Sequence, residues 1–538
     1  MKNITKSISN ERIAWCALLI VLVLAGIIRY GLLNVPFQRD EGEYAYAGQL
    51  ILQGIPPYQE VYNMKFPGIY GAYALFLAMF GQSNQGIHTA LLIINAITII
   101  TVFLLAKHIV NPLCGVISAA SFALLSVSQA VQGVFANAEH FVIVFATGGL
   151  LVMLRGLATA SLFRLFAAGL LLGLGFVMKQ HGFAFSALAV LYIVFDSLRQ
   201  RPIQWRGLAL RVLLFTGGVL TVFGCLCLIM AWTGVFKSFW FWTFNYASAY
   251  ISQLPLGQAW PRFITKFTAI VRSASLLWIL VGLGFFTLVT KSIKKHHRVF
   301  LLMYAIFSVL SICPGFYFRR HYFVLLLPCA SLLVGVTISV FADFLSRFSS
   351  KKIQYGVPIF LMVICLCQSI YKQRDFIFHM TPFQISRSTY GLNPFPESLE
   401  IADFIQKHTS PEDRIAILGS EPQIFFYSQR RSASSYIYMY PLMENHDFAL
   451  QMQKGFIKDV QTRNPKYLIY VDVPTSWLQR PDSHKEIFQW LDGYLQRGQL
   501  KLVGVVELLN DEAVYHWESD VKWPDLSRLW IAIFERTT

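Results

Sequence analysis

The amino-acid sequence predicts a membrane protein of about eleven transmembrane helices, followed by a smaller soluble α/β domain. Three observations indicate this fold class: the composition, the length of the apolar runs, and a change of pattern after residue 372. Of 538 residues, 55% are hydrophobic and only 14% are charged, whereas a soluble chain carries about 25% charged residues. The net charge of +16 does not indicate a nucleic-acid partner, because most of the excess falls in short loops between apolar runs.

Eleven apolar runs are candidates for crossing about 30 Å of hydrocarbon. The first follows the basic segment 1–12, is long for a signal-peptide core and lacks a clear small-x-small cleavage site, so it is interpreted as an uncleaved first helix. The runs are 13–33, 86–106, 112–130, 139–154, 164–178, 182–197, 211–232, 272–291, 299–313, 321–343 and 354–371.

Basic loops set the expected topology. Four clusters fall on one side if all eleven runs cross, and this side is expected to be cytoplasmic. A twelfth apolar stretch, 66–82, would place the basic N-terminus opposite these loops, so it is expected to be an interfacial or re-entrant helix. The chain is therefore predicted to lie in a bacterial inner membrane, with its N-terminus cytoplasmic and its C-terminal domain periplasmic. The clusters are Arg155 with Arg164; Arg199, Arg201, Arg206 and Arg211; Lys291, Lys294, Lys295 and Arg298; and Arg347, Lys351 and Lys352.

The polar tail, 373–538, is expected to be a domain separate from the membrane domain, 1–372. Helical and strand-like patterns alternate along it, which is typical of a small α/β domain. The eight cysteines all precede residue 370, so cysteine usage does not indicate the compartment in which the tail lies. The helical patterns cover 397–408, 441–462 and 484–496, and the strand-like runs cover 414–418, 467–471, 502–506 and 529–534.

The first outer loop places three carboxylates, Asp40, Glu41 and Glu43, just past the first span. Acidic side chains near a membrane are costly, which favours a functional interpretation. At helical spacing Asp40 and Tyr44 share a face while Glu41 points elsewhere. The alternative is a solvated loop whose acids cap an interfacial helix.

Several short motifs resemble those of a known family. The runs Arg39-Asp40-Glu41-Gly42-Glu43-Tyr44 and Gln53-Gly54-Ile55-Pro56-Pro57-Tyr58 resemble the first-loop signature of C-type membrane glycosyltransferases. Their branch contains the dolichyl-phosphate-mannose–protein mannosyltransferases and the bacterial lipid A aminoarabinose transferases. Further stretches fit bacterial members: Asn137-Ala138-Glu139, Lys179-Gln180-His181-Gly182, Arg319-Arg320-His321-Tyr322, and Leu418-Gly419-Ser420-Glu421-Pro422-Gln423.

The resemblance implies the C-type fold, a lipid-linked sugar phosphate as donor, no nucleotide sugar, and an aspartate of the first outer loop acting at the acceptor. Here that aspartate is Asp40, with Glu41 as the second catalytic candidate. His181 departs from the family pattern, in which a less polar residue often stands, and this places its role in doubt.

The chemistry agrees with these assignments. Transfer from a sugar phosphate passes through an oxocarbenium-like state. An acceptor hydroxyl needs a general base, which a positioned carboxylate supplies, whereas the departing phosphate needs cations. The expected outer ends of spans carry such cations; their alternative role is that of snorkelling or interfacial charges. The donor-phosphate candidates are Lys179, Arg319, Arg320 and His321.

Other polar residues of the outer segments are candidates for substrate contacts. Glu139 has the alternative of interacting with a helix dipole, and Glu421 that of capping the following helix. Asp40, Glu41 and Glu139 with His140 or His321 could hold a divalent ion, but no spacing matches a dedicated motif, so metal dependence stays open. No organic cofactor is expected. The substrate-contact candidates are Tyr44, Lys65, Asn137, Glu139, His140, Gln180, Tyr322 and Glu421.

The sequence thus predicts an inverting hexosyl- or pentosyltransferase. Its donor would be a polyprenyl-phosphate-linked sugar, and its acceptor an envelope protein, lipid A or another glycan at the periplasmic face. The alternative is a membrane transporter or flippase of a lipid-linked sugar. Transporters show internal repeats and midplane polar residues, whereas here the ionisable residues gather towards one face and no internal repeat is found.

Overall fold

The structure is a computed structural model that describes residues 2–290, 292–348 and 350–537. The chain divides into two compact units. Unit 1 comprises Met1–Leu33, His88–Ile229 and Leu254–His379, and unit 2 comprises Asn34–Ile87, Met230–Gln253 and Met380–Thr538. The polar tail therefore shares its unit with two segments that precede residue 373 in the chain. One of these segments contains the acidic first loop.

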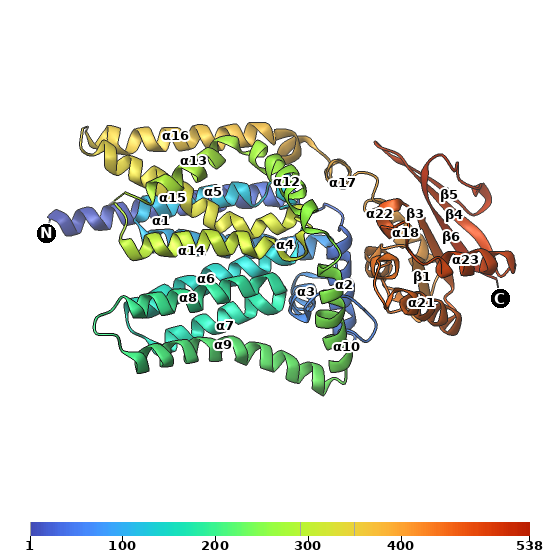
Figure 1. Ribbon diagram of the computed structural model, residues 1–538. Coiled ribbons are helices and arrows are strands. Elements are labelled where there is room, and N and C mark those ends of the chain that lie inside the picture. The colour runs from blue at the N-terminus through green and yellow to red at the C-terminus, as the bar shows by residue number, and fades with distance from the viewer. Residues whose placement is uncertain (1, 291, 349, 538) are drawn as a thin grey trace. The chain divides into compact units, whose positions relative to one another are not determined.

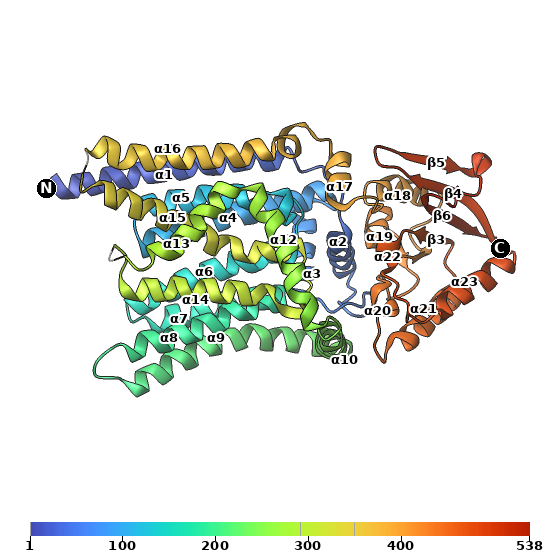
Figure 2. The same cartoon turned by 45° about the horizontal axis from the view of Figure 1, so that its top comes forward.

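Unit 1 is a bundle of helices. Each of the eleven predicted apolar runs corresponds to a helix, and successive helices run antiparallel in both ribbon views (Figure 1, Figure 2). The helices are α1 (Lys2–Tyr30), α4 (Asn84–Ile109), α5 (Pro112–Leu125), α6 (Ala138–Ala158), α7 (Leu162–Met178), α8 (Phe183–Leu198), α9 (Trp205–Trp232), α13 (Ser275–Thr287), α14 (Lys295–Ile312), α15 (Leu327–Leu345) and α16 (Lys351–Lys372). Short 3-10 turns precede three of them: η1 (Gln129–Val131), η2 (Gln180–Gly182) and η6 (Arg320–Leu326).

Not every helix of the bundle has the length of a membrane span. Among the described residues, seven helices are long and apolar enough to cross, or eight if the bent pair α12 (Ala259–Ser273) and α13 counts as one span. The bend between those two is 110°. The prediction of about eleven spans exceeds this number, because α5 and α7 have only 14 and 17 residues and α14 begins with four basic or histidine residues. Fourteen residues extend only about 21 Å.

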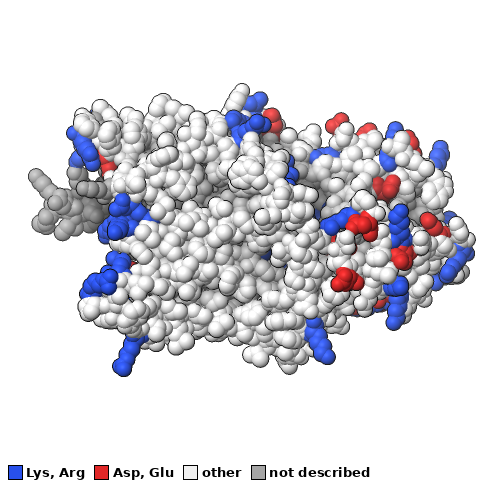
Figure 3. All heavy atoms as spheres, viewed as in Figure 1, with Lys and Arg blue, Asp and Glu red and all other residues white. Residues whose placement is uncertain are grey.

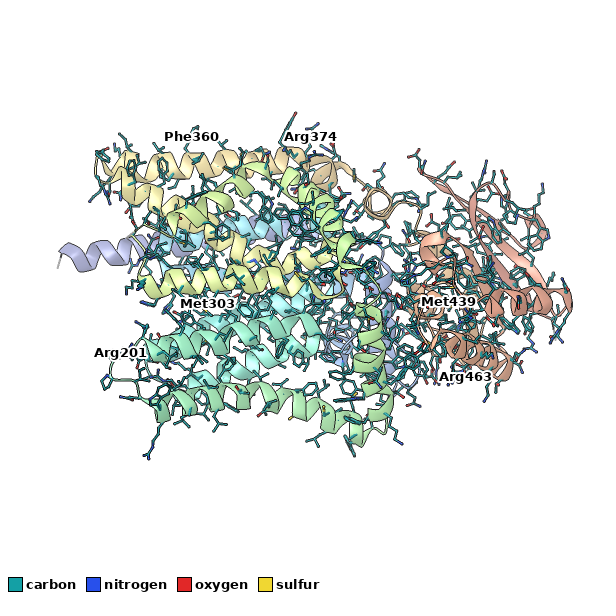
Figure 4. The ribbon with its side chains drawn as sticks, in the orientation of Figure 1. Arg201, Met303, Phe360, Arg374, Met439 and Arg463 are labelled. Carbon is teal, nitrogen blue, oxygen red and sulfur yellow. The ribbon has the colours of Figure 1, made fainter. Side chains whose placement is uncertain are left out.

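Charge is concentrated at the ends of the bundle. The four basic loops, which join α6 to α7, α8 to α9, α13 to α14 and α15 to α16, lie at the end where α1 begins (Figure 1). Figure 3 shows Lys and Arg gathered at this end, while the flank of the helices is nearly uncharged. Arg201 marks this end in Figure 4, and Arg374 lies beyond the opposite end of α16. Charged ends and an apolar flank are typical of helices that cross a bilayer.

Unit 2 contains the two helices of the first loop, α2 (Arg39–Leu52) and α3 (Pro67–Phe80). Proline at the first position starts α3, and Gly81, with φ 90°, ends it. Its 14 residues make α3 too short for a span, as expected for 66–82. Helix α2 packs closely against α3 and α19 (Pro422–Ser428), which Figure 2 labels. A Cβ on Gly42 would lie 2.6 Å from the backbone nitrogen of Gln423, so this packing requires glycine.

The tail forms one six-stranded sheet in the order β2-β1-β3-β6-β4-β5. β1 pairs in parallel with β2 and β3, and the remaining pairs are antiparallel. The central strands are buried along most of their length, as expected for strands covered on both faces. The strands are β1 (Arg414–Leu418), β2 (Arg431–Ser432), β3 (Tyr467–Asp472), β4 (Leu500–Leu508), β5 (Ala513–Trp517) and β6 (Leu529–Arg536).

The four predicted strands and two of the three predicted tail helices are confirmed. The third predicted helix, 441–462, is instead two helices, because His446 hydrogen-bonds to the carbonyl of Pro441 in a turn between them. The edge strands β2 and β5 are not among the predicted strands. The helices of unit 2 besides α2, α3 and α19 are α10 (Phe236–Trp240), the π-helical η3 (Phe241–Tyr246), α11 (Ala247–Ile251), α17 (Pro382–Tyr390), α18 (Glu397–Lys407), α20 (Tyr440–Met443), α21 (Ala449–Arg463), α22 (Pro474–Trp477) and α23 (Glu486–Gln496).

Candidate active site

Asp40 lies in the first turn of α2, and its neighbour Glu41 helps to start this helix. Gln38 and Glu41 form a capping box: the Gln38 side chain accepts from the backbone N–H of Asp40 at 2.8 Å, and the backbone N–H of Gln38 donates to Glu41 Oε2 at 3.2 Å. Glu41 is fully buried. The alternative of a helix-capping role therefore describes Glu41, whereas the Asp40 carboxylate points into a different set of contacts.

The Asp40 carboxylate accepts two hydrogen bonds on the same oxygen. Lys65 Nζ donates to Oδ1 at 2.9 Å, and the Tyr438 hydroxyl donates to it at 3.0 Å. Lys65 also donates to the Tyr44 hydroxyl at 3.0 Å and lies 4.8 Å from the centre of that ring. The side chain of Asp40 is 20% exposed. Three predicted site residues, Asp40, Tyr44 and Lys65, are thus brought together.

Glu43 belongs to the same group, although the sequence analysis assigned it no role. Its Oε1 accepts from the Tyr70 hydroxyl at 2.5 Å, and its Oε2 lies 3.7 Å from Lys65 Nζ. Complete burial raises the pKa of Glu43 to about 7, with Lys65 opposing the rise and the charge of Asp40 adding to it. Asp40, Glu43, Tyr44, Lys65 and Tyr438 are called the carboxylate cluster below.

Lys65 is the cation of this cluster. Burial would lower the pKa of Lys65, but the charges of Asp40 and Glu43 and the Tyr44 hydroxyl raise it well above its usual value. The ammonium group therefore lies charged between the carboxylate of Asp40 and the carboxyl group of Glu43.

Arg39, the residue before Asp40, is held by the tail of unit 2. Its guanidinium donates to Glu421 Oε1 at 2.5 Å, to the Tyr440 hydroxyl at 2.5 Å, and to the backbone carbonyl of Ser420. Glu421 precedes α19 but makes no side-chain capping hydrogen bond there. The capping role considered for Glu421 is therefore wrong, because its carboxylate pairs with Arg39 instead.

A second group of predicted residues lies in unit 1. Glu139, in the first turn of α6, pairs with Lys179 at the end of α7, and His321 Nε2 lies 3.9 Å from Glu139 Oε1. Lys179 Nζ lies 4.4 Å from the centre of the Tyr322 ring. Glu139 has a fully buried side chain and that of Lys179 is 9% exposed. Glu139, Lys179, His321 and Tyr322 are called the buried ion-pair cluster.

The remaining predicted residues surround these groups in unit 1. Asn137 is the residue preceding α6, and Gln180 begins η2. His140 is 1% exposed, and within the part of the chain that the structure describes neither of its ring nitrogens has a hydrogen-bond partner. Arg319 lies over the Tyr317 ring at 5.6 Å. Together with Arg320 and Arg262, it lies near enough to Lys266 for their charges to interact.

The metal ligands considered from the sequence are Asp40, Glu41, Glu139, His140 and His321. Among the described residues, no group of three or more His, Cys, Asp or Glu is arranged to hold a metal ion. In the carboxylate cluster, a lysine supplies the positive charge next to Asp40.

Comparison with known proteins gives a class. Residues 67–223 match the family model described as dolichyl-phosphate-mannose-protein mannosyltransferase. No curated protein sequence matches the chain.

Solved structures match over almost the whole chain. ArnT from Cupriavidus metallidurans bound to undecaprenyl phosphate has a TM-score of 0.59 at 15% identity, covering 96% of this chain and 97% of that one. The archaeal oligosaccharyltransferase AglB from Archaeoglobus fulgidus, in complex with an inhibitory peptide and a dolichol-phosphate, has a TM-score of 0.55 at 13% identity, covering 95% of this chain and 75% of that one. At these identities the likeness shows the fold.

The helical bundle, the first-loop helices and the α/β tail have the fold of these C-type membrane glycosyltransferases. The family match covers residues 67–223, less than half of the chain, and agrees with the resemblance seen in the sequence motifs. The fold class predicted from the sequence is confirmed.

Proposed function

We propose that the chain transfers a monosaccharide from a polyprenyl-phosphate-linked donor to an envelope acceptor at the periplasmic face, with Asp40 as the general base. The observation that carries this proposal is the geometry of Asp40 and Lys65. A partly exposed carboxylate at the start of a helix lies 2.9 Å from an ammonium group whose side chain is 14% exposed. A base for the acceptor and a cation for the donor phosphate thus stand side by side.

The reaction balances with these two residues. The acceptor oxygen attacks the anomeric carbon while its proton passes to Asp40. The bond from that carbon to the phosphate oxygen breaks, and the electron pair leaves with the polyprenyl phosphate. Lys65 stabilises the negative charge of the leaving phosphate, because a nearby cation is most effective in a site shielded from water. Attack from the face opposite the phosphate inverts the anomeric configuration.

Other cations are candidates for holding the donor phosphate. Arg319 and Arg320 belong to a group of positive charges with Arg262 and Lys266, and Lys179 lies beside Tyr322. Each lysine is balanced by a carboxylate, Lys65 by Asp40 and Lys179 by Glu139. Asp40 loses its charge when it takes the acceptor proton, whereas Glu139 keeps its charge, so a phosphate at Lys179 would have to compete with that carboxylate. Removing a charge-assisted contact to the donor should cost about 1.5–3 kcal/mol of binding free energy. We therefore expect Arg319→Ala and Arg320→Ala to weaken donor binding more than Lys179→Ala does.

The acceptor remains within three classes: a protein, lipid A or another envelope glycan. The neighbours carry different molecules, a peptide with dolichol-phosphate in AglB and undecaprenyl phosphate in ArnT. Both include a polyprenyl or dolichyl phosphate, which supports the donor class of the proposal.

The test is a transfer assay with purified protein and polyprenyl-phosphate-linked sugars. A transferase releases polyprenyl phosphate when an acceptor is present, whereas a transporter or flippase leaves the donor intact. Mass spectrometry of envelope glycoconjugates from cells with and without the gene identifies the sugar and the acceptor. Movement of an intact donor across the membrane, with no acceptor needed and no polyprenyl phosphate released, would contradict the proposal.

A further inference from the structure

The sheet of the tail has a point at which the strand order reverses, the place where α/β sheets bind ligands. β1 leads through α19 to β2 on one side, and β3 lies on the other side of β1. Ligands of such sheets bind beyond the carboxyl ends of the strands, at the point where the strand order reverses. Here that point lies beyond the ends of β1 and β3, at Gly419–Glu421 and Pro474–Ser476.

The residues that follow β1 and β3 at this point are hydrogen-bonded to one another and to Arg39. Ser420 N donates to Ser476 Oγ at 2.7 Å, and the Tyr440 hydroxyl donates to the carbonyl of Thr475 at 2.7 Å. Arg39 bonds to Ser420, Tyr440 and Glu421. The side chain before Asp40 therefore occupies the ligand position of the tail's sheet, and this fixes the start of α2.

The same tail supplies Tyr438. The backbone next to Tyr438 is also held in place. The N–H of the following residue, Met439, which Figure 4 labels, donates to Ser420 Oγ at 2.9 Å. Tyr438 is 5% exposed, and Met439 is fully buried. Burial raises the pKa of the Tyr438 hydroxyl well above its usual value, and the negative charge of Asp40 raises it further. The hydroxyl therefore keeps its proton and remains a donor across the working pH range.

We infer that Tyr438 is a positioning residue for the catalytic base: its hydroxyl orients the Asp40 carboxylate and stabilises its charged form, so that the tail completes the active site. This inference rests on the proposed role of Asp40. A hydrogen bond donated to a carboxylate favours its ionised form and lowers its pKa. Tyr438 also acts with Lys65 on a single oxygen of Asp40, which restricts the rotation of the carboxyl group.

The test in the active enzyme is the pH profile of Tyr438→Phe in the full-length protein. Loss of the donor should move the acidic limb of kcat to higher pH by roughly 0.5–1 pH unit. Because the base must be ionised, turnover falls most below neutral pH, while KM for the donor changes little. Tyr436→Phe, two residues earlier in the same segment, is the matched control and should keep the wild-type profile. An unchanged acidic limb in a folded Tyr438→Phe variant would overturn the inference.

A second measurement does not depend on activity. Thermal unfolding of the wild type, Tyr438→Phe, Asp40→Ala and the double variant forms a cycle that isolates the coupling between the two side chains. We expect a favourable coupling at pH 7, because the two side chains share a hydrogen bond. No coupling at pH 7 would refute the contact even if no sugar donor proved active, whereas a failed transfer assay with intact coupling would count against the proposed function alone.

Discussion

The two acid–lysine clusters of this chain have the same parts and different surroundings. In the carboxylate cluster, Lys65 pairs with Asp40 and lies over Tyr44. In the buried ion-pair cluster, Lys179 pairs with Glu139 and lies over Tyr322. The acid of the first pair is 20% exposed, whereas the acid of the second is completely buried.

This difference in exposure distinguishes a pair that can react with a substrate from a pair that stabilises the fold. A partly exposed carboxylate can meet a substrate and exchange a proton with it, at little cost to the fold. A buried pair that loses one partner leaves an uncompensated charge, which is strongly destabilising. We therefore expect substitutions in the first cluster to change turnover and substitutions in the second to change stability.

The largest expected effect is on turnover, from Asp40→Asn. Asn keeps the shape and one acceptor oxygen but cannot take a proton. Loss of a general base should lower the rate about 10²–10⁴-fold, with donor binding and the unfolding temperature nearly unchanged. The check is a transfer assay on correctly inserted protein.

Glu41→Gln is the matched control for Asp40→Asn. Glu41 is fully buried and serves the capping box, and Gln can fill the same position of such a box. Its effect on transfer should therefore be mild. Normal turnover in Asp40→Asn together with loss in Glu41→Gln would mean that the base is Glu41.

Lys179→Ala tests the other side of the comparison. It leaves Glu139 buried without its lysine partner, which should cost about 3–5 kcal/mol of stability. Replacing both residues, in Lys179→Ala with Glu139→Gln, should recover a large part of that loss. Thermal unfolding in detergent measures both. If Lys179→Ala kept full stability but lost donor binding, the lysine would be a phosphate ligand and the comparison would fail.

A pH titration of stability distinguishes the carboxylate cluster again. The pKa of Glu43 is raised by burial from 4.5 to about 7, so the unfolded chain releases this proton at a lower pH than the folded one. The favourable contribution of Glu43 to the free energy of unfolding is complete below about pH 4.5 and is lost as the pH rises to about 7. The loss should be roughly 3 kcal/mol, from 1.36 kcal/mol per pKa unit. Glu43→Gln should flatten the unfolding free energy across this window.

Glu60 provides a control of opposite sign. Burial would raise the pKa of Glu60, but hydrogen bonds from Arg414 and Arg431 lower it below 4.5. Its contribution is therefore present above pH 4.5 and is lost as the pH falls below that value. Glu60→Gln should change the free energy of unfolding only below pH 4.5. If Glu60→Gln instead changed it between pH 4.5 and 7, the pH dependence in that window could not be assigned to Glu43.

Much of the fold follows from local patterns in the sequence. Apolar runs predicted eleven helices of unit 1 but not the amphipathic α12, and strand-like runs predicted four of the six strands. The strands that escaped prediction are β2, which has only two residues, and β5, whose residues are all half-buried. Their pairing depends on neighbours that are distant in the sequence, so no local period indicates them.

The site residues that lie within about one turn of the same helix could be predicted from the sequence. Asp40 and Tyr44 share a face of α2, and Glu43 is close enough to this face to approach Lys65 as well. Tyr438 follows Asp40 by 398 positions, and no spacing rule connects them. The Glu421 contact with Arg39 was equally hidden, because a residue between a strand and a helix usually serves as a cap.

The smallest expected effect comes from Gly42→Ala, which tests whether the carboxylate cluster depends on the seat of α2. The added Cβ would lie 2.6 Å from the backbone nitrogen of Gln423, and backbone cannot move aside as a flexible side chain can. Helices α2 and α19 must then separate, at about 1–3 kcal/mol, and Asp40 shifts away from Tyr438. We expect lower turnover with a modest loss of thermal stability. Gly71→Ala on α3 is the matched control, since no other element of the described chain has an atom within 4 Å of its Cβ position. There the substitution should raise stability by about 0.4–1 kcal/mol, because alanine restricts the unfolded chain, and transfer should stay normal. Equal activity in the two variants would mean that the seat of α2 against α19 does not position the base.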